Sequence, residues 1–588
     1  MQHDKPKTPH LSLCARLTQY WACLVAVILI GLAFVHASEL IWTSDDAFAS
    51  FRYARNWARG LGLVFNPNER VEGITNPLWT LLLGVLYRAG FDIESAATWL
   101  GIVAYLSSIG LLLWVDRTDR RASDGDSDLL PVAALVAVAD VDWATFASGG
   151  LETSLFTFCL LGACVASVHG TNPRVSGALS GFSCACASMV RPDGLLVMPA
   201  LMLGLVRRER RSGLLPFALA SLPLLGAFHG IRRLYYGDWL PNTYYAKSAF
   251  SSWWQQGAIY LGYFAERHWA LLGVLSLSVA FAVANRLGMF TSGDAPAYQD
   301  TPHERTLWHR LLTSSAVAGI YGLGVVRVGG DFMYARLLVP TIPLLAIATA
   351  TALRLALRRQ AVLRSVLGVG MAGLLLLTPC PVDTSLVAHH GIVDERAYYQ
   401  GGFVQAAEAE AAKLRDCLGE YPARVAIYGG ELRLAYRADF PYAVESHAGL
   451  TDRFVAHQPL TSRQRIGHEK SAPAAYLVTT RRMHFAVSPI YAALSDPTGY
   501  IHNIHADLCG VDVRLLHWDP SFVDYVRRRG AKVTDYPAWL DRLIMQIPHM
   551  PDETVRRHWE MAQHFYFQFN EDERRAQAFS ARLHHNPR

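Results

Sequence analysis

Two adjacent carboxylates, Asp45 and Asp46, follow the first long apolar run of the chain. Phe48, Phe51 and Tyr53 come next, at a spacing that predicts a helix lying on a membrane surface. Capping such a helix needs only one polar side chain, whereas a general base for a hydroxyl nucleophile needs a carboxylate that faces the substrate. Neighbouring helical residues point about 100° apart. We therefore predict that one carboxylate is the base and that the other orients the loop or binds a cation. Which of them is the base stays open.

Basic side chains recur in the polar loops between later apolar runs, and several violate the usual placement of arginine on the cytoplasmic side. Charged groups at membrane depth tend to mark functional sites, and the planar fork of arginine suits phosphate. The predicted ligands of a phosphate are Arg52, Arg191, Arg232, Arg233, Tyr245, Lys247, Arg327 and Arg336. Ion pairs with Asp193, Asp238 or Asp331 are the alternative role for these basic residues.

Further polar residues of the same loops and of the later sequence are predicted to line the same pocket. They are Glu72, Asn76, Glu152, Asp193, Asn242, Asp331, His447, Asp452, His468, Glu469 and Lys470. Two have plain alternatives, since Glu152 suits a helix start and Asp331 follows two glycines in what could be an ordinary loop. The segment from His447 to Lys470 lacks the spacing of a zinc site. The sequence identifies no certain cofactor, and a divalent cation beside the carboxylates stays open.

The elements that must position these residues are mostly apolar. The chain has 588 residues, of which 52% are hydrophobic and 18% charged, and its net charge is +5. With a mean hydropathy of +0.17, this composition excludes a disordered chain and argues against a soluble enzyme. The small net charge gives no reason to expect a nucleic-acid partner.

Long apolar runs predict an α-helical, polytopic membrane domain at residues 1–379. The eleven predicted spans are Tyr20–Ala37, Ala96–Val115, Leu129–Phe146, Leu151–Val168, Val175–Val190, Gly194–Val206, Gly213–Ile231, Trp269–Ala284, His309–Val326, Leu337–Leu353 and Ala361–Thr378. Pro77–Leu86 is too short to span, and we predict that it dips into the outer leaflet. With the amino terminus inside, the dense arginine clusters all fall on the cytoplasmic side.

Residues 380–588 are predicted to form a soluble α/β or α+β domain on the outer side. Predicted strands are Arg424–Tyr428, Ala475–Thr479 and Val513–Leu516, and predicted helices are Phe403–Leu418 and Asp552–Phe569. Outside the cytoplasm a disulfide can persist. We predict a bond between Cys417 and Cys509, with Cys380 free, although spacing alone cannot fix the pairing.

The loop motifs resemble the GT-C superfamily of polyprenyl-phosphate-sugar-dependent glycosyltransferases, and more closely its AftB-type arabinofuranosyltransferases. The matching strings run from Asp45 through Asn56, then Gly62-Leu-Val-Phe-Asn-Pro67, Arg70-Val-Glu-Gly73, Gly150-Leu-Glu-Thr153, Arg191-Pro-Asp-Gly194, Tyr236 through Lys247, Gly329-Gly-Asp-Phe-Met333, Gly449-Leu-Thr-Asp452 and Gly467-His-Glu-Lys470. The resemblance extends to about residue 470. It also places Glu152 where such enzymes often carry a second acidic residue.

What the resemblance implies is a multi-pass enzyme of the bacterial cytoplasmic (inner) membrane, with its active site and C-terminal domain on the periplasmic side. The donor would be decaprenyl- or undecaprenyl-phosphate arabinofuranose, and the acceptor a glycan or glycoprotein of the cell envelope. Two other functions stay open. One is a GT-C enzyme that moves mannose or another sugar, and the other is a lipid-linked saccharide transporter. A non-catalytic receptor would show no dependence on Asp45 or Asp46.

Overall fold

The computed structural model describes residues 13–122, 128–289, 301–400, 402–428, 430–487 and 504–584. The chain forms two compact units. The helical unit comprises residues 1–43, 95–228 and 253–394, and the sheet unit comprises residues 44–94, 229–252 and 395–588. The sequence predicted a single boundary after residue 379. The sheet unit instead draws two loops from the first half of the chain.

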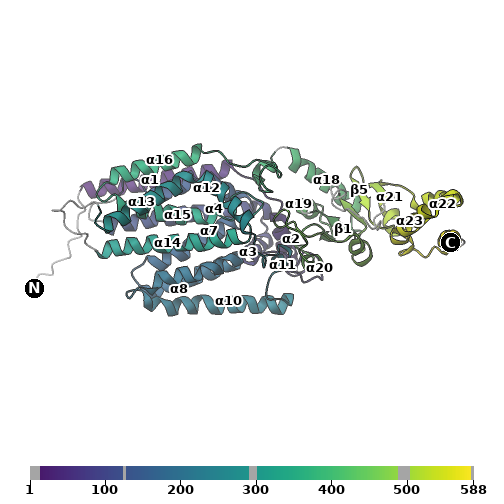
Figure 1. The fold of residues 1–588 in the computed structure, drawn as a ribbon, viewed down its shortest axis with the longest axis horizontal. Coiled ribbons are helices and arrows are strands. Elements are labelled where there is room, and N and C mark those ends of the chain that lie inside the picture. The colour runs from purple at the N-terminus through teal and green to yellow at the C-terminus, as the bar shows by residue number, and fades with distance from the viewer. Residues whose placement is uncertain are drawn as a thin grey trace, which may run out of the picture. The chain divides into compact units, whose positions relative to one another are not determined.

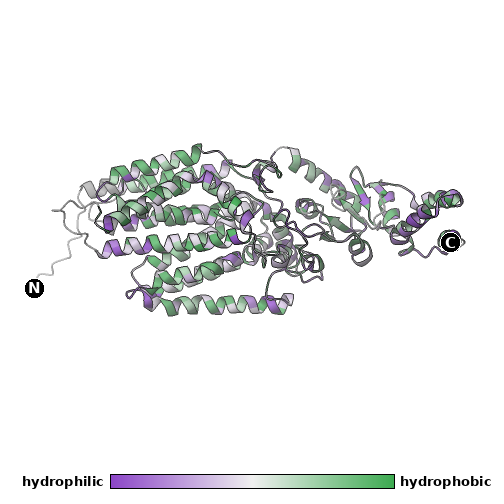
Figure 2. Ribbon diagram, in the orientation of Figure 1, coloured by the Kyte–Doolittle hydropathy of each residue, from purple (hydrophilic) through white to green (hydrophobic). Residues whose placement is uncertain are grey.

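The helical unit consists of apolar helices that run alongside one another (Figure 1, Figure 2). Its helices are α1 (Leu13–Glu39), α4 (Ile93–Ala122), α5 (Val132–Ala139), α6 (Val141–Ser148), α7 (Thr153–Val168), α8 (Pro173–Val190), η1 (Pro192–Val197), α9 (Met198–Val206), η2 (Arg211–Gly213), α10 (Leu214–Tyr236), α12 (Trp254–Arg267), α13 (Trp269–Arg286), α14 (Pro302–Arg327), η3 (Val339–Thr341), α15 (Ile342–Ala356) and α16 (Ala361–Leu377). Helices α4 and α10 each continue across a boundary into residues of the sheet unit.

Among the described residues, five helices are long and apolar enough to cross a membrane, or six if the bent pair α6 and α7 forms one span. The eleven predicted segments are all mainly helical, but the count of eleven spans is not confirmed. One reason is visible at Leu129–Phe146, where Asp140 ends α5 and its carboxylate accepts the Trp143 N–H at 2.8 Å to start α6. A further bend of 118° separates α6 from α7.

Helices α8 and α10 approach closely because α8 carries glycines at the contact. A Cβ on Gly177 would lie 2.0 Å from the Gly213 carbonyl oxygen, and one on Gly181 would lie 2.3 Å from that of Phe217. Small residues four apart are a common means of packing membrane helices.

A network of ion pairs joins the ends of three helices of the helical unit. Arg354 contacts Asp116 at 2.9 Å and Asp128 at 2.7 Å, and also contacts Asp119. Arg310 contacts the same Asp119 at 2.5 Å. These pairs tie the ends of α4, α14 and α15 together.

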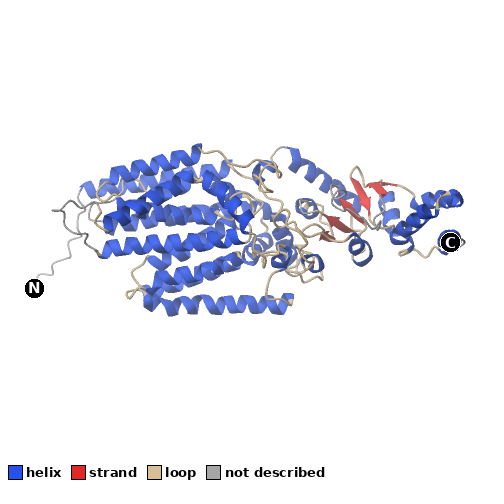
Figure 3. Ribbon diagram, in the orientation of Figure 1, coloured by secondary structure: helices blue, strands red, loops and turns tan. Residues whose placement is uncertain are grey.

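The sheet unit is built around a six-stranded mixed sheet in the order β2-β1-β3-β5-β4-β6 (Figure 3). Its strands are β1 (Arg424–Ile427), β2 (Tyr442–Glu445), β3 (Phe485–Val487), β4 (Ile504–Asp507), β5 (Asp512–Leu515) and β6 (Lys532–Val533). Strands β2, β1 and β3 are parallel, and the remaining pairs are antiparallel.

Helices of 3 to 17 residues complete the unit. They are α2 (Ala47–Ala58), α3 (Pro77–Arg88), α11 (Asn242–Ala246), α17 (Glu395–Tyr398), α18 (Gly402–Leu418), α19 (Leu432–Arg437), α20 (Arg453–Ala456), η4 (Tyr476–Thr480), α21 (Pro520–Arg528), α22 (Tyr536–Gln546), η6 (Ile547–His549), α23 (Asp552–Ala562), η7 (Gln563–Phe567) and α24 (Glu573–His584).

Most of the predicted elements of this unit are confirmed. Strands β1 and β5 and helices α18, α23 and η7 occupy predicted segments. The strand predicted at Ala475–Thr479 is wrong, because residues 476–480 form the helical turn η4, which packs Leu477 and Val478 into the core. A short apolar run does not by itself distinguish a buried strand from a buried helix. The predicted disulfide between Cys417 and Cys509 is confirmed, and Cys380 is free and exposed.

The aromatic residues of α2 are buried in protein, which corrects the prediction that they face a membrane surface. Phe48, Phe51 and Tyr53 are each at most 1% exposed. The ring of Tyr436 on α19 lies 5.5 Å from that of Phe48 and 6.2 Å from that of Phe51. Helix α2 is therefore a core element of the sheet unit.

The loop after α2 is joined to the edge of the sheet by a side-chain amide. Asn66 Nδ2 donates to the Ala443 carbonyl at 2.8 Å, and its Oδ1 accepts the Ala443 N–H at 3.0 Å. This pair of bonds imitates one rung of a β-ladder on strand β2. It explains why residues 44–94 fold with the C-terminal third of the chain.

Candidate active site

The two adjacent carboxylates take different environments, as predicted from their spacing. Asp45 is 3% exposed, and its carboxylate accepts the N–H groups of Arg433 at 2.9 Å and Leu432 at 3.0 Å, at the start of α19. Asp46 is half-buried at the N-cap of α2, and its side chain makes no capping bond to the described amides of that helix. Asp45 therefore holds α19, and the more accessible carboxylate is that of Asp46.

Burial dominates the electrostatics of Asp45. It raises the pKa of this carboxyl from the usual 3.8 to about 7, although the two backbone N–H groups oppose the shift. The neighbouring carboxylate of Asp46 adds to the rise. The position of the loop is fixed further by Arg433, whose guanidinium lies 4.4 Å from the Phe48 ring centre.

A second group of residues gathers positive charge and neutral imidazoles around Lys247. Its Cε lies 3.6 Å from the place that a Cβ would take on Gly467. The rings of His447 and His468 lie 5.6 Å apart. Burial first, and then the charge of Arg465, lower the pKa of His447 to about 4 and that of His468 to about 3. Both rings are therefore neutral at pH 7 and can donate a hydrogen bond to an anion. We call Lys247, Arg465, His447 and His468 the cationic cluster.

The carboxylates and the cationic cluster are connected within the sheet unit through Tyr428. The Tyr428 N–H donates to Glu431 at 2.8 Å, and Glu431 directly precedes the amides that bind Asp45. On its other side the Tyr428 ring stacks on that of His447 at 4.4 Å. A short chain of contacts thus links an acid and a cationic group, which are the two needs of a transfer to a hydroxyl with a phosphate leaving group.

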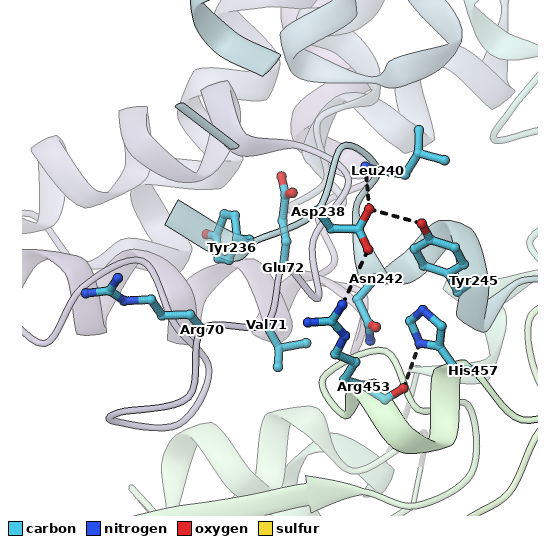
Figure 4. A pocket seen from close by; sticks show the side chains of 10 residues that line it. All are labelled: Arg70, Val71, Glu72, Tyr236, Asp238, Leu240, Asn242, Tyr245, Arg453 and His457. Atoms are coloured by element: carbon cyan, nitrogen blue, oxygen red, sulfur yellow. Dashed lines mark hydrogen bonds and ion pairs between the residues drawn. The ribbon is translucent and has the colours of Figure 1, made fainter. Parts of the chain in front are cut away.

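A third feature is the pocket drawn in Figure 4, with a volume of about 270 Å³ that is open to solvent. Asp238 accepts from the Tyr245 hydroxyl at 3.0 Å and the Leu240 N–H at 3.2 Å. The ring of Tyr245 stacks on that of His457 with centres 4.2 Å apart. Glu72, which also lines the pocket, binds Arg232 through both oxygens at 2.7 and 3.1 Å.

The loops around these features are held by buried polar side chains. Glu445 accepts four backbone N–H groups, from residues 447 to 450, at 2.6–3.1 Å. Asn242 donates to the carbonyls of Gly449, Leu450 and Asp452. Lys470 donates to the Tyr245 carbonyl at 2.7 Å. These bonds fix the loop that carries Lys247 against the loop that carries His447.

Other predicted residues of the sheet unit have structural partners. Arg52 donates to the carbonyls of Phe65 and Phe440, both at 2.8 Å. The remaining partners are Arg233 with the Gly237 carbonyl, Asn76 with Ser50 and Thr80, Asp452 with Arg481 and Tyr476, and Glu469 with Arg463. Of the predicted phosphate ligands in this unit, Lys247 is the one that lies in the cationic cluster.

The predicted residues of the helical unit form their own ion pairs. Arg191 binds Glu152 at 2.8 Å and Asp193 at 2.7 Å. Arg336 binds Asp331 at 2.6 Å. Arg191 and Arg336 therefore form the ion pairs that were predicted as their alternative role. Arg327 is exposed at the end of α14.

Three residues missed by the sequence analysis belong to these features. Arg465 completes the cationic cluster, Glu445 holds its loop, and Arg453 faces Asp238 at 3.8 Å across the pocket. Arg465 could have been found, since it stands two residues before the Gly467 motif. Glu445 could not, because nothing in its sequence neighbourhood distinguishes it from an exposed acid.

Among the described residues, His484, His517 and Asp519 bring three possible metal-ligand atoms within 4.8 Å of one another. Tetrahedral zinc ligands lie closer, at about 3.3 Å for bonds of about 2 Å. His484 Nδ1 accepts the Arg424 N–H at 3.0 Å, and Nε2 lies 3.4 Å from the Asp519 carboxylate. Asp519 also caps α21. The role of Asp519 as the cap of α21 accounts for its place beside the two histidines better than a metal centre does.

The apolar helices and the polar α/β unit define a multi-pass membrane protein. No family model matches the chain. Over 425 residues it is 31% identical to the terminal β-(1→2)-arabinofuranosyltransferase of Mycobacterium tuberculosis, covering 66% of each chain. Over 369 residues it is 30% identical to the protein of that name from Corynebacterium glutamicum, covering 56% of this chain and 50% of the relative.

The chain is therefore a homologue of the terminal β-(1→2)-arabinofuranosyltransferases, as its loop motifs predicted, and it aligns with half to two thirds of their length. Among solved structures, it resembles ArnT from Cupriavidus metallidurans bound to undecaprenyl phosphate, with a TM-score of 0.43 and 13% identity over 79% of this chain and 96% of that chain. The corresponding values for the apo state of ArnT are 0.40, 14%, 85% and 98%.

Proposed function

We propose that the protein is a membrane glycosyltransferase that moves D-arabinofuranose from a polyprenyl-phosphate donor to a hydroxyl of a cell-envelope glycan or glycoprotein. The names of its relatives support the class of enzyme and the sugar. The observation that carries the proposal is the link, inside one compact unit, between the acidic loop and the cationic cluster.

In the proposed reaction, Asp46 takes the proton of the acceptor hydroxyl while that oxygen bonds to the anomeric carbon. The bond between this carbon and the phosphate oxygen breaks, and polyprenyl phosphate leaves with the electron pair. Lys247 and Arg465 stabilise the developing charge, and the neutral histidines donate to the phosphate oxygens. Asp45 is a positioning residue, because both of its oxygens already accept backbone N–H groups.

The test is turnover by the purified full chain. It is incubated with an arabinofuranosyl acceptor and either prenyl-phosphate arabinofuranose or prenyl-phosphate mannose, and release of prenyl phosphate is measured. We expect release with the arabinose donor. Preference for the mannose donor would refute the assignment of the sugar. No release of prenyl phosphate from either donor would refute the proposal that the protein is a glycosyltransferase.

We also propose that the protein lies in the inner membrane with the sheet unit on the periplasmic side. The distribution of arginine over the loops supports this orientation. Reporter fusions after Arg121 and Arg211 should report the cytoplasm, and a fusion after Val393 the periplasm. A cytoplasmic signal at Val393 would reverse the topology and move the reaction to the other side.

A further inference from the structure

The pocket of Figure 4 is not used by the mechanism above, although its side chains are arranged to bind a ligand. Asp238 Oδ1 is occupied by Tyr245 and by the backbone. Its other oxygen faces Arg453 at 3.8 Å. Hydrogen bonds between nitrogen and oxygen are about 2.7–3.2 Å long, so Arg453 and Asp238 face each other without forming a direct hydrogen bond.

This separation suits a hydroxyl group. One hydroxyl can donate to Asp238 Oδ2 and accept from Arg453 at the same time, because its bonds of about 2.8 Å meet above a gap of 3.8 Å. Arg453 is well placed to adapt to such a ligand, since its side chain is 60% exposed. The result is a donor and an acceptor that match the two roles of a sugar hydroxyl.

The wall beside this gap is aromatic. His457 Nδ1 donates to the Arg453 carbonyl at 2.8 Å, so Nε2 is the ring nitrogen left to bind a ligand. Stacking on Tyr245 holds the ring in place. Aromatic side chains of this kind combine an apolar body with a polar tip, which matches the alternation of C–H and O–H groups on a sugar.

One carboxylate of the pocket disfavours an anion beside Arg453. Glu72 is paired with Arg232, and the Arg70 guanidinium lies over the ring of Tyr235, 4.9 Å from its centre, whereas Asp238 faces the gap itself. A phosphate placed here would meet the Asp238 carboxylate. The empty space of about 270 Å³ includes open solvent, so a ligand bound here would lie partly exposed, as the terminal unit of a longer glycan would.

We propose that this pocket is a saccharide subsite that holds one sugar of the acceptor glycan. Its place in the fold supports the link to transfer, since Asp238 and Tyr245 lie on the loop that ends in Lys247 of the cationic cluster. Saccharide binding is independent of the proposed function, whereas its description as an acceptor subsite rests on it.

The first test separates binding of the acceptor from the chemistry. In the purified full chain, Arg453→Gln should raise the KM for an arabinofuranosyl disaccharide acceptor about tenfold, the loss expected for about 1.4 kcal/mol. The KM for the donor and the slow release of prenyl phosphate to water should stay unchanged. The matched control is Arg574→Gln, since Arg574 is 76% exposed on α24 and pairs only with Asp541 in the described chain. An unchanged acceptor KM in Arg453→Gln would overturn the proposal.

The second test does not need turnover, so it remains informative if the enzyme assignment fails. Saturation-transfer NMR with the full chain in detergent should show the disaccharide bound by the wild type and by Arg574→Gln, with a signal lost in Arg453→Gln. Inorganic phosphate should not compete. Competition by phosphate would make the pocket an anion site, and equal signals from both variants would place the sugar elsewhere. Either result overturns the proposal.

Discussion

Replacing Asp45 by asparagine tests its proposed positioning role, as distinct from the proposed catalytic role of Asp46, through the pH dependence of stability. The folded protein raises the pKa of Asp45 from 3.8 to about 7. Since the folded state holds a proton that the unfolded state releases, stability falls as pH rises between about 4 and 7 and is flat above that window. The difference amounts to about 4 kcal/mol at about 1.4 kcal/mol per pKa unit, of which about 3 kcal/mol falls between pH 5 and pH 8.

Asp45→Asn stays neutral and removes this slope. It also sets an amide N–H against one backbone N–H, at a pH-independent cost of about 1–3 kcal/mol. The assay is the melting temperature in detergent at pH 5 and pH 8. Relative to wild type, the variant should gain on the order of 2–5 °C between the two pH values. If the difference between variant and wild type is the same at both, the burial argument is wrong.

Asp46→Asn is the companion variant, because it changes the neighbouring carboxylate without touching α19. It keeps the Asp45 carboxyl and should therefore keep most of the fall in melting temperature between pH 5 and pH 8, somewhat reduced because the Asp46 carboxylate contributes to the raised pKa of Asp45. Prenyl-phosphate release should fall roughly 10²–10⁴-fold, as expected for a lost general base. Normal turnover in this variant, combined with inactivity of well-folded Asp45→Asn, would exchange the two roles.

Three further outcomes follow from single contacts. Lys247→Ala should raise the donor KM about 10–100-fold through loss of a charge-assisted bond, and an unchanged donor KM in steady-state kinetics would remove Lys247 from the phosphate site. Glu72→Gln removes the buried carboxylate that pairs with Arg232, so the free energy of unfolding in denaturant should fall by about 3–5 kcal/mol. A smaller fall in a variant that also carries Arg232→Met would identify the unpaired charge as the cause. Reducing the bond between Cys417 and Cys509, which closes a loop of 92 residues, should lower stability by about 4–5 kcal/mol; a melting temperature insensitive to reductant would contradict this.

Sequence reasoning succeeded where a signal is local. Apolar runs located the helices. The presence of Cys417 and Cys509 in the region predicted to lie outside the cytoplasm indicated the disulfide that the structure contains. The pairing of Arg191 with Asp193 could also be foreseen, because the two residues are neighbours in the motif.

The remaining contacts join distant parts of the chain and leave no local pattern. Asp45 binds amides 387 and 388 residues away, so its helix appeared to face a membrane when its aromatic residues in fact pack on α19. Burial of both faces removes the alternation that would reveal a partner. The function of Glu445 was hidden for a similar reason, since a carboxylate that binds backbone amides has no sequence signature.

The three-part origin of the sheet unit has a consequence for synthesis. Arg52 finds its acceptor at Phe440, 388 residues later in the chain, which a ribosome takes roughly 20–80 s to reach at about 5–20 residues per second. During that interval Phe48 and Phe51 have no α19 to cover them, so the nascent chain carries exposed aromatic surface while the intervening helices insert. The loop that carries Asp45 is thus among the first parts to be made and among the last to be completed, and a ribosome stalled before α19 leaves Asp45 without the amides that hold it in place.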